Sequence, residues 1–170
     1  TERLMAMHIV PLSISYEFDP CDFLKAKEFQ MKRDNPAYKK TRADDLINMQ
    51  TGLFGYKGRV HYACAPCIDD WIATREGLSN AEFFAATARR LDEEIYRNYR
   101  LYPNNFVALD LLNNWKDYIS HYSEEDKVQF EQYLRQQIDK IDLPNKDEAF
   151  LRERLLEMYA NPAKNQLAVS

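Results

Sequence analysis

From residue 79 to residue 159, apolar residues recur at helical spacing, and this pattern constrains the fold more than any other feature. Ser79 and Glu82 have the spacing of a capping box, which starts the first helix. Breaks at Pro103 and Pro144, with a serine cap between them, divide the segment into four helices. The side chains expected to face inward are Phe84, Leu91 and Ile95; Val107, Leu111 and Trp115; Phe130, Leu134 and Ile138; and Leu151, Leu155 and Met158. Their mutual burial should hold the four helices together as one layer.

Two expected strands precede these helices. In residues 7–16 the period of two places Val10, Leu12, Ile14 and Tyr16 on one face. The opposite face carries small side chains rather than charged ones, so both faces are expected to be covered. Pro11 cannot donate to a ladder and marks an edge or a strand start. Residues 59–65 form the second strand, which we expect to lie beside the first in one sheet.

Two short helices are expected between the strands. The first begins at Asp19, which is followed by a proline, and the second begins at Thr41. Three evenly spaced glycines, Gly52, Gly55 and Gly58, end the second helix and lead into the second strand.

Together these elements predict an α+β fold, with a small two-stranded sheet covered by a mainly helical C-terminal half and a frayed tail from Asn161. Two strands are too few for a self-sufficient sheet, so the pair is expected to be the remnant of a larger one. Residues 1–78 would hold the strands, and residues 79–170 a helical extension packed on them as one structural unit. Because the sequence opens at Thr1 almost directly on an apolar strand, we interpret the chain as a piece of a longer protein.

Composition narrows the functional classes. The formal net charge of −4 lacks the basic surplus of most nucleic-acid-binding proteins, so no nucleic-acid partner is expected. Three cysteines without disulfide-style spacing favour a reducing compartment. No apolar run approaches the roughly 18 residues that a spanning helix needs, so any membrane contact is expected to be peripheral.

His121 and Asp126 have the His-x4-Asp spacing of an acyltransferase's base and its orienting acid. Asp126, however, lies in the first turn expected after a serine cap, where acids are favoured by free amides and by the helix dipole. His121 ends the preceding helix, where a cation is favoured. The pair is therefore interpreted as helix-end chemistry, not as a catalytic centre.

The cysteines offer two further chemistries. Cys64 and Cys67 have thioredoxin-type spacing, but the helix expected after them is short and its acids oppose thiolate formation. A zinc site from His61, Cys64 and Cys67, with Cys21 as a distant fourth ligand, lacks the usual second cysteine pair. Both readings are less favoured than buried structural cysteines, and no metal or other cofactor is expected.

Lys57 and Arg59 place two cations beside the glycine series Gly52, Gly55 and Gly58. These glycines join a helix to a strand, whereas a phosphate-binding loop joins a strand to a helix. A phosphate contact and a solvated turn both remain open here.

Residues 8–17 are similar to the fourth motif of glycerol-phosphate and acylglycerol-phosphate acyltransferases, in which Val10-Pro11 begins a strand that runs into Tyr16-Glu17. A second similarity follows at residues 58–62, where a glycine leads a strand that Pro66 closes; Ala63-Cys64 stand where the family usually has Phe-Gly. Weaker similarity to larger bacterial members continues to residue 112.

The resemblance implies an enzyme of phospholipid biosynthesis in which a histidine deprotonates a glycerol hydroxyl that attacks an acyl thioester. The family's His-x4-Asp centre and its phosphate-binding motifs lie N-terminal to this strand, so the chain alone is expected to be inactive. The substrate-binding residues would be Val10, Pro11, Leu12 and Ile14 on the acyl side, together with Lys57 and Arg59.

The implied partners are an acyl-CoA or acyl carrier protein thioester and a glycerolipid acceptor. The implied location of the intact protein is the cytoplasm, at the inner face of the membrane. Where the rest of the sheet is missing, the flank from Val10 to Ile14 should stay uncovered by the chain and be hidden by a homodimer or a displaced segment. Two alternatives remain: a non-catalytic α+β interaction domain and, less favoured, a redox module through Cys64 and Cys67.

Overall fold

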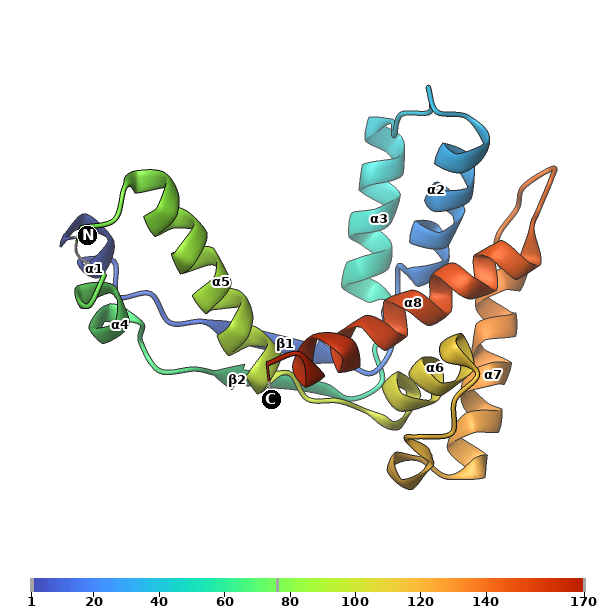
Figure 1. Cartoon of the computed structure of the whole chain (residues 1–170). Coiled ribbons are helices and arrows are strands. Elements are labelled where there is room, and N and C mark those ends of the chain that lie inside the picture. Colours follow the sequence, from blue (N-terminus) through green and yellow to red (C-terminus); the bar gives the residue numbers. More distant parts are fainter. Residues whose placement is uncertain (1, 76, 170) are drawn as a thin grey trace. The chain divides into compact units, whose positions relative to one another are not determined.

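The computed structural model describes residues 2–75 and 77–169 and has an α+β fold (Figure 1). In chain order the elements are α1 (Glu2–Met5), β1 (Leu12–Tyr16), α2 (Asp22–Asp34), α3 (Arg42–Phe54), β2 (Val60–Cys64), α4 (Asp69–Ala73), α5 (Asn80–Asn98), α6 (Pro103–Asn113), a short 3-10 helix η1 (Ile119–His121), α7 (Glu124–Asp139) and α8 (Glu148–Leu167). None of the described helices is both long enough and apolar enough to cross a membrane.

The chain divides into two compact units, and the division does not follow the expected boundary between residues 78 and 79. The unit we call the sheet unit comprises the described residues of 1–15, 60–100 and 165–170. The helical unit comprises residues 16–59 and 101–164. Each unit is described by itself below.

In the sheet unit, β1 and β2 pair as a two-stranded antiparallel sheet, which confirms that the two strands are neighbours. The Ala65 amide donates to the Pro11 carbonyl over 2.9 Å, and this register sets Ile14 opposite Tyr62 and Leu12 opposite Cys64. The first strand starts later than expected, at Leu12, because His8 has a left-handed backbone with φ of 50° and Pro11 has no N–H to donate.

A small apolar cluster anchors the sheet unit. Ile68, Ile72 and Phe83 are buried together, with Ile9 and Trp71 packed against them. The expected stripe on α5 is wrong at its first position, because Phe83 is buried whereas Phe84 is 62% exposed. The capping box of Ser79 and Glu82 starts α5 as expected.

The helical unit has the larger core, built from α2, α6, α7 and α8. Phe130, Leu134 and Ile138 on α7 are buried as predicted, as are Leu151 and Leu155 on α8. α2 and α3 form a hairpin (Figure 1). The thiol of Cys21, the residue before α2, donates a hydrogen bond to the Asn48 carbonyl on α3. α3 contains no buried residue, so its apolar side chains Leu46, Ile47 and Leu53 are exposed.

Three expected boundaries differ in the helical unit. α2 begins at Asp22 rather than beside Asp19, whose carboxylate accepts from the Cys21 amide in a turn. α6 ends at the left-handed Asn114, so Trp115 lies beyond the helix and is exposed. α8 does not fray at Asn161 but runs through Pro162, because burial of Ala160 and Ala163 offsets the hydrogen bond that proline cannot make.

Candidate functional site

The outward side of the sheet is an exposed apolar surface. We call it the outer sheet face and define it by Val10, Leu12, Ile14, Val60 and Tyr62. Leu12 is 45% exposed and Ile14 40% exposed, whereas the alternating Ser13 and Ser15 are buried. The expectation that both faces of this strand are covered is therefore wrong for the described chain, and the expectation of an uncovered flank is confirmed.

Contacts on the inner side of the sheet explain why the serines of β1 are buried and its apolar side chains are exposed. The Ser15 hydroxyl accepts a 2.8 Å hydrogen bond from the Arg100 amide, which fixes the chain after α5 against the strand. Small serine side chains permit that close approach, whereas leucine or isoleucine would not fit. The apolar side chains of the strand must then face outward, because successive residues alternate between the two faces.

The predicted substrate-binding residues do not all share one surface. Val10, Leu12 and Ile14 contribute to the outer sheet face, but Pro11 is buried. Lys57 and Arg59 belong to the helical unit, where both have protein partners. The Lys57 ammonium donates to the carbonyls of Leu53 and Gly55, at the C-terminal end of α3.

Arg59 is held by Glu17. Its guanidinium donates to both carboxylate oxygens of Glu17, over 2.8 and 3.1 Å, and its backbone amide donates to the same carboxylate. Partial burial raises the pKa of Glu17, but the hydrogen bonds and charge of Arg59 outweigh this effect and hold that pKa below its ordinary value. A phosphate at Arg59 would have to compete with this bidentate pair.

Glu17→Gln should reduce the loss of free energy of unfolding that the helical unit undergoes as the pH falls. Because the folded-state pKa of Glu17 is lowered, its stabilisation is present above the ordinary glutamate pKa of about 4.3 and is lost as the pH falls through the lowered value. We expect the free energy of unfolding of the wild type to exceed that of the variant by about 1 kcal/mol or less at pH 7, because Arg59 is largely exposed. Urea unfolding at pH 7 and pH 3 tests this, and a difference that grows on acidification would contradict it.

The His121 and Asp126 pair does not form a base and acid. Asp126 and Ser123 make the capping box of α7, and the Asp126 carboxylate accepts from the Ser123 amide and hydroxyl. The His121 ring stacks on Phe106, with ring centroids 4.2 Å apart. The interpretation of this motif as helix-end chemistry is confirmed for Asp126.

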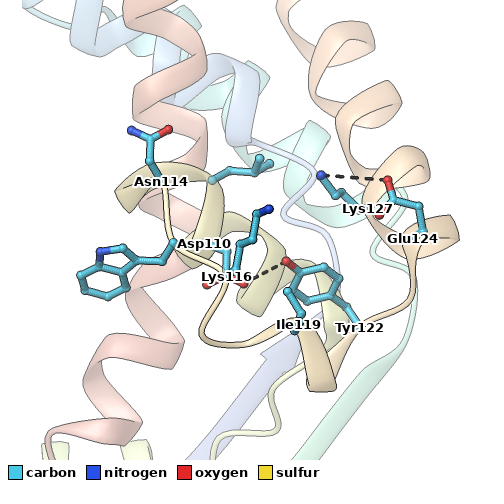
Figure 2. A pocket seen from close by; sticks show the side chains of 9 residues that line it. Asp110, Asn114, Lys116, Ile119, Tyr122, Glu124 and Lys127 are labelled. Carbon is cyan, nitrogen blue, oxygen red and sulfur yellow. Dashed lines mark hydrogen bonds and ion pairs between the residues drawn. The ribbon is translucent and has the colours of Figure 1, made fainter.

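A pocket of about 540 Å³ lies between α6, η1 and α7 in the helical unit (Figure 2). Its polar centre is Asp110, which is 3% exposed and accepts hydrogen bonds from the Tyr122 hydroxyl and the Tyr118 amide. Burial and the bond to Asp110 raise the pKa of Tyr122 to about 12, so its hydroxyl remains a donor. Sequence reasoning missed this site, although a single acid within the apolar run of α6 was the available signal.

A second buried carboxylate lies in the helical core. Asp22 accepts 2.6 Å hydrogen bonds from the hydroxyls of Tyr133 and Tyr159, and also accepts from the Phe23 amide. Burial raises the pKa of Asp22 more than these hydrogen bonds lower it. Phe130 and Tyr159 close the cluster with an edge-on ring contact, so this network belongs to the core rather than to an open site.

The cysteines are separated by the fold. Cys21 lies in the helical unit, whereas Cys64 and Cys67 lie in the sheet unit, and all three are free. Cys64 and Cys67 are exposed, so the expectation that they are buried structural cysteines is wrong. Only five residues form α4 after Cys67, so the long helix of a thioredoxin-type site is not present at this position. His61 is on the inner side of β2 and Cys64 is on the outer side, as their strand spacing predicted.

Comparisons of the chain with protein-family models, with curated proteins and with solved structures found no match.

Proposed function

We propose that this chain forms the acyl-binding part of a glycerolipid acyltransferase and does not catalyse acyl transfer by itself. The observation that carries the proposal is the outward direction of the apolar side chains on β1, the strand that resembles the fourth motif of that family. Leu12 and Ile14 are exposed there, and the antiparallel register adds Tyr62 beside them.

An acyl chain suits this surface physically. Each methylene removed from water contributes about 0.8 kcal/mol, and a micromolar Kd corresponds to about 8 kcal/mol, so burial of about ten methylenes would supply that affinity without any polar partner. The outer sheet face is extended and lacks charged side chains among its five defining residues. The apolar surface fits the acyl chain, and the family resemblance implies that this chain is carried as a thioester with coenzyme A or a carrier protein as the leaving group.

The proposal that the chain is catalytically inactive rests on its three histidines. His121 stacks on Phe106, and His61 has no carboxylate at the family's spacing. His8 contacts Asp69, but these residues are 61 positions apart and do not form a His-x4-Asp motif. Incubation with palmitoyl-CoA and glycerol 3-phosphate or an acylglycerol phosphate should yield no product. Transfer that His121→Ala abolishes would overturn this half of the proposal.

Binding of palmitoyl-CoA below its micelle concentration tests the other half. Leu12→Asp and Ile14→Asp should each weaken binding about tenfold or more, because a carboxylate in the apolar contact costs at least about 1.4 kcal/mol. Leu53→Asp is the matched control, since Leu53 is an exposed leucine on α3 in the other unit. Equilibrium dialysis measures the affinities of the wild type and of the three variants, with coenzyme A alone as the control ligand.

The outcomes separate the proposal from its main rival. Loss of binding in Leu12→Asp but not in Leu53→Asp supports an acyl site on the outer sheet face. If only Leu53→Asp loses binding, the proposed position is wrong. If wild type binds no acyl-CoA and instead dimerises in a way that Leu12→Asp prevents, the non-catalytic interaction domain is the better description.

A further inference from the structure

We propose that His8, Cys67 and Asp69 form a binding site for a borderline-soft divalent metal ion of the zinc class. The three side chains each offer one ligand atom, and these atoms all lie within 4.8 Å of one another. The His8 Nδ1 atom already lies 2.6 Å from an oxygen of Asp69. This inference concerns only the sheet unit and does not depend on the acyl-binding proposal.

Two segments far apart in the sequence are held together at this point. The Ile68 amide, between Cys67 and Asp69, donates a 3.0 Å hydrogen bond to the carbonyl of Ile9, the neighbour of His8. Ile68 is buried in the small apolar cluster, and Ile9 packs against that cluster. The backbones that carry all three ligands are thus fixed by a hydrogen bond and by apolar burial before any ion binds.

The Asp69 carboxylate has unused binding capacity. One of its oxygens contacts His8, whereas the other, Oδ1, is buried and has no hydrogen-bond partner among the described residues. A buried carboxylate oxygen without a partner is costly, and metal coordination by this group would remove part of that cost. His8 and Cys67 are exposed, so an ion can reach the cluster from solvent.

The donor set selects the class of metal. A thiolate, an imidazole and a carboxylate are the three ligand types that zinc binds, at about 2.0 to 2.3 Å, whereas calcium and magnesium require oxygen ligands. Three protein ligands leave the fourth tetrahedral position to water. The His8–Asp69 hydrogen bond must open as both groups turn toward the ion, because ligand atoms around tetrahedral zinc lie more than about 3 Å apart.

Sequence spacing could not reveal this group. Cys67 has the nearby residues His61 and Cys64 as the obvious co-ligands, but neither belongs to the cluster. His8 and Asp69 are 61 residues apart, and the pairing of residue 9 with residue 68 brings them together. Cys64 is therefore a matched control, since it is an exposed free cysteine three residues from Cys67.

Cobalt(II) titration of the reduced, chelator-treated chain under anaerobic conditions tests the site. We expect one equivalent to produce a thiolate-to-cobalt charge-transfer band and the visible bands of a tetrahedral ion, both removed by added zinc. Cys67→Ser should abolish the charge-transfer band, whereas Cys64→Ser and Cys21→Ser should retain it. His8→Ala and Asp69→Asn should each weaken zinc binding about tenfold or more, as measured by competition with a chromophoric chelator.

Circular dichroism of each variant verifies that the fold is intact, and a variant that unfolds is replaced by Cys67→Ala or His8→Gln. No saturable cobalt or zinc binding by the wild-type chain would overturn the proposal. A charge-transfer band that survives in Cys67→Ser, or that Cys64→Ser removes equally, would also overturn it, because the thiolate would then come from another cysteine.

Discussion

Asp22→Ala is expected to lower the free energy of unfolding of the helical unit by about 3 to 5 kcal/mol. The substitution leaves three donors without their acceptor: the buried hydroxyl of Tyr159, and the partly buried hydroxyl of Tyr133 and amide of Phe23. Each donor left unsatisfied costs about 1 to 3 kcal/mol. Part of this cost is recovered, because burial already disfavours the charged form of Asp22 and the two hydroxyls lie 3.0 Å apart and can bond to each other.

Urea unfolding followed by the fluorescence of Trp115 measures this loss. Trp115 lies in the helical unit and Trp71 in the sheet unit, so a Trp71→Phe background isolates the signal of the helical unit. Asp117→Ala is the matched control, since Asp117 is an exposed acid of the same unit and should change stability by no more than about 0.5 kcal/mol. A cost below about 1 kcal/mol for Asp22→Ala would show that the network contributes little.

Phe83→Ala should destabilise the sheet unit by about 3 kcal/mol, whereas Phe84→Ala should have almost no effect. Phe83 is 8% exposed and packs with Ile68 and Ile72, so its removal leaves a cavity in a cluster too small to close around it. Phe84 is 62% exposed, and surface substitutions usually change stability by no more than about 0.5 kcal/mol.

Trp71 reports this experiment directly, because it packs against the same cluster and can be made the single tryptophan by Trp115→Phe. The two substitutions are matched in chemistry and differ by one position on the same helix. Equal costs for both, or a larger cost for Phe84→Ala, would indicate that α5 has the rotation that its apolar stripe predicted rather than the one in the structure.

The local features of the helices could be predicted because their causes are local. Ser79 with Glu82 and Ser123 with Asp126 are reciprocal contacts across three residues. The first pair forms the predicted capping box, and the predicted cap at Ser123 also forms a box with Asp126. The stripes on α7 and α8 were also predictable, because Phe130, Leu134, Leu151 and Leu155 face a large core that imposes a single rotation on each helix.

The rotation of α5 was not predictable in the same way. Its buried face carries Thr87 and Glu94 beside Phe83, and Glu94 is tolerated there because Arg90 lies 2.5 Å away and Arg97 also contacts it. Burial of a paired acid depends on partners that a hydrophobic stripe does not include. The apolar pattern alone therefore predicted Phe84 as the buried residue, one position after Phe83, which is the one that the structure buries.

In the candidate sites, too, some features follow from the local sequence and others depend on tertiary contacts. Alternation in β1 determined that Leu12 and Ile14 share a face, but only the contact between Ser15 and the Arg100 amide decided that this face points outward. The sequence placed Lys57 and Arg59 near a glycine turn but did not identify their partners. The structure shows that the Arg59 guanidinium binds the Glu17 carboxylate.

By itself, the sequence determined the α+β class and the positions of most helices, because these follow from periodicity and from contacts within a few residues. The pairing of the two strands was predictable for a different reason: the sequence predicted no third strand with which either could pair. Only the tertiary structure decided which side of the sheet is covered, where Asp22 and Asp110 find their hydroxyl donors, and that His8 meets Cys67 and Asp69. Those outcomes depend on contacts between residues that are 12 to more than 100 positions apart, so no local pattern encodes them.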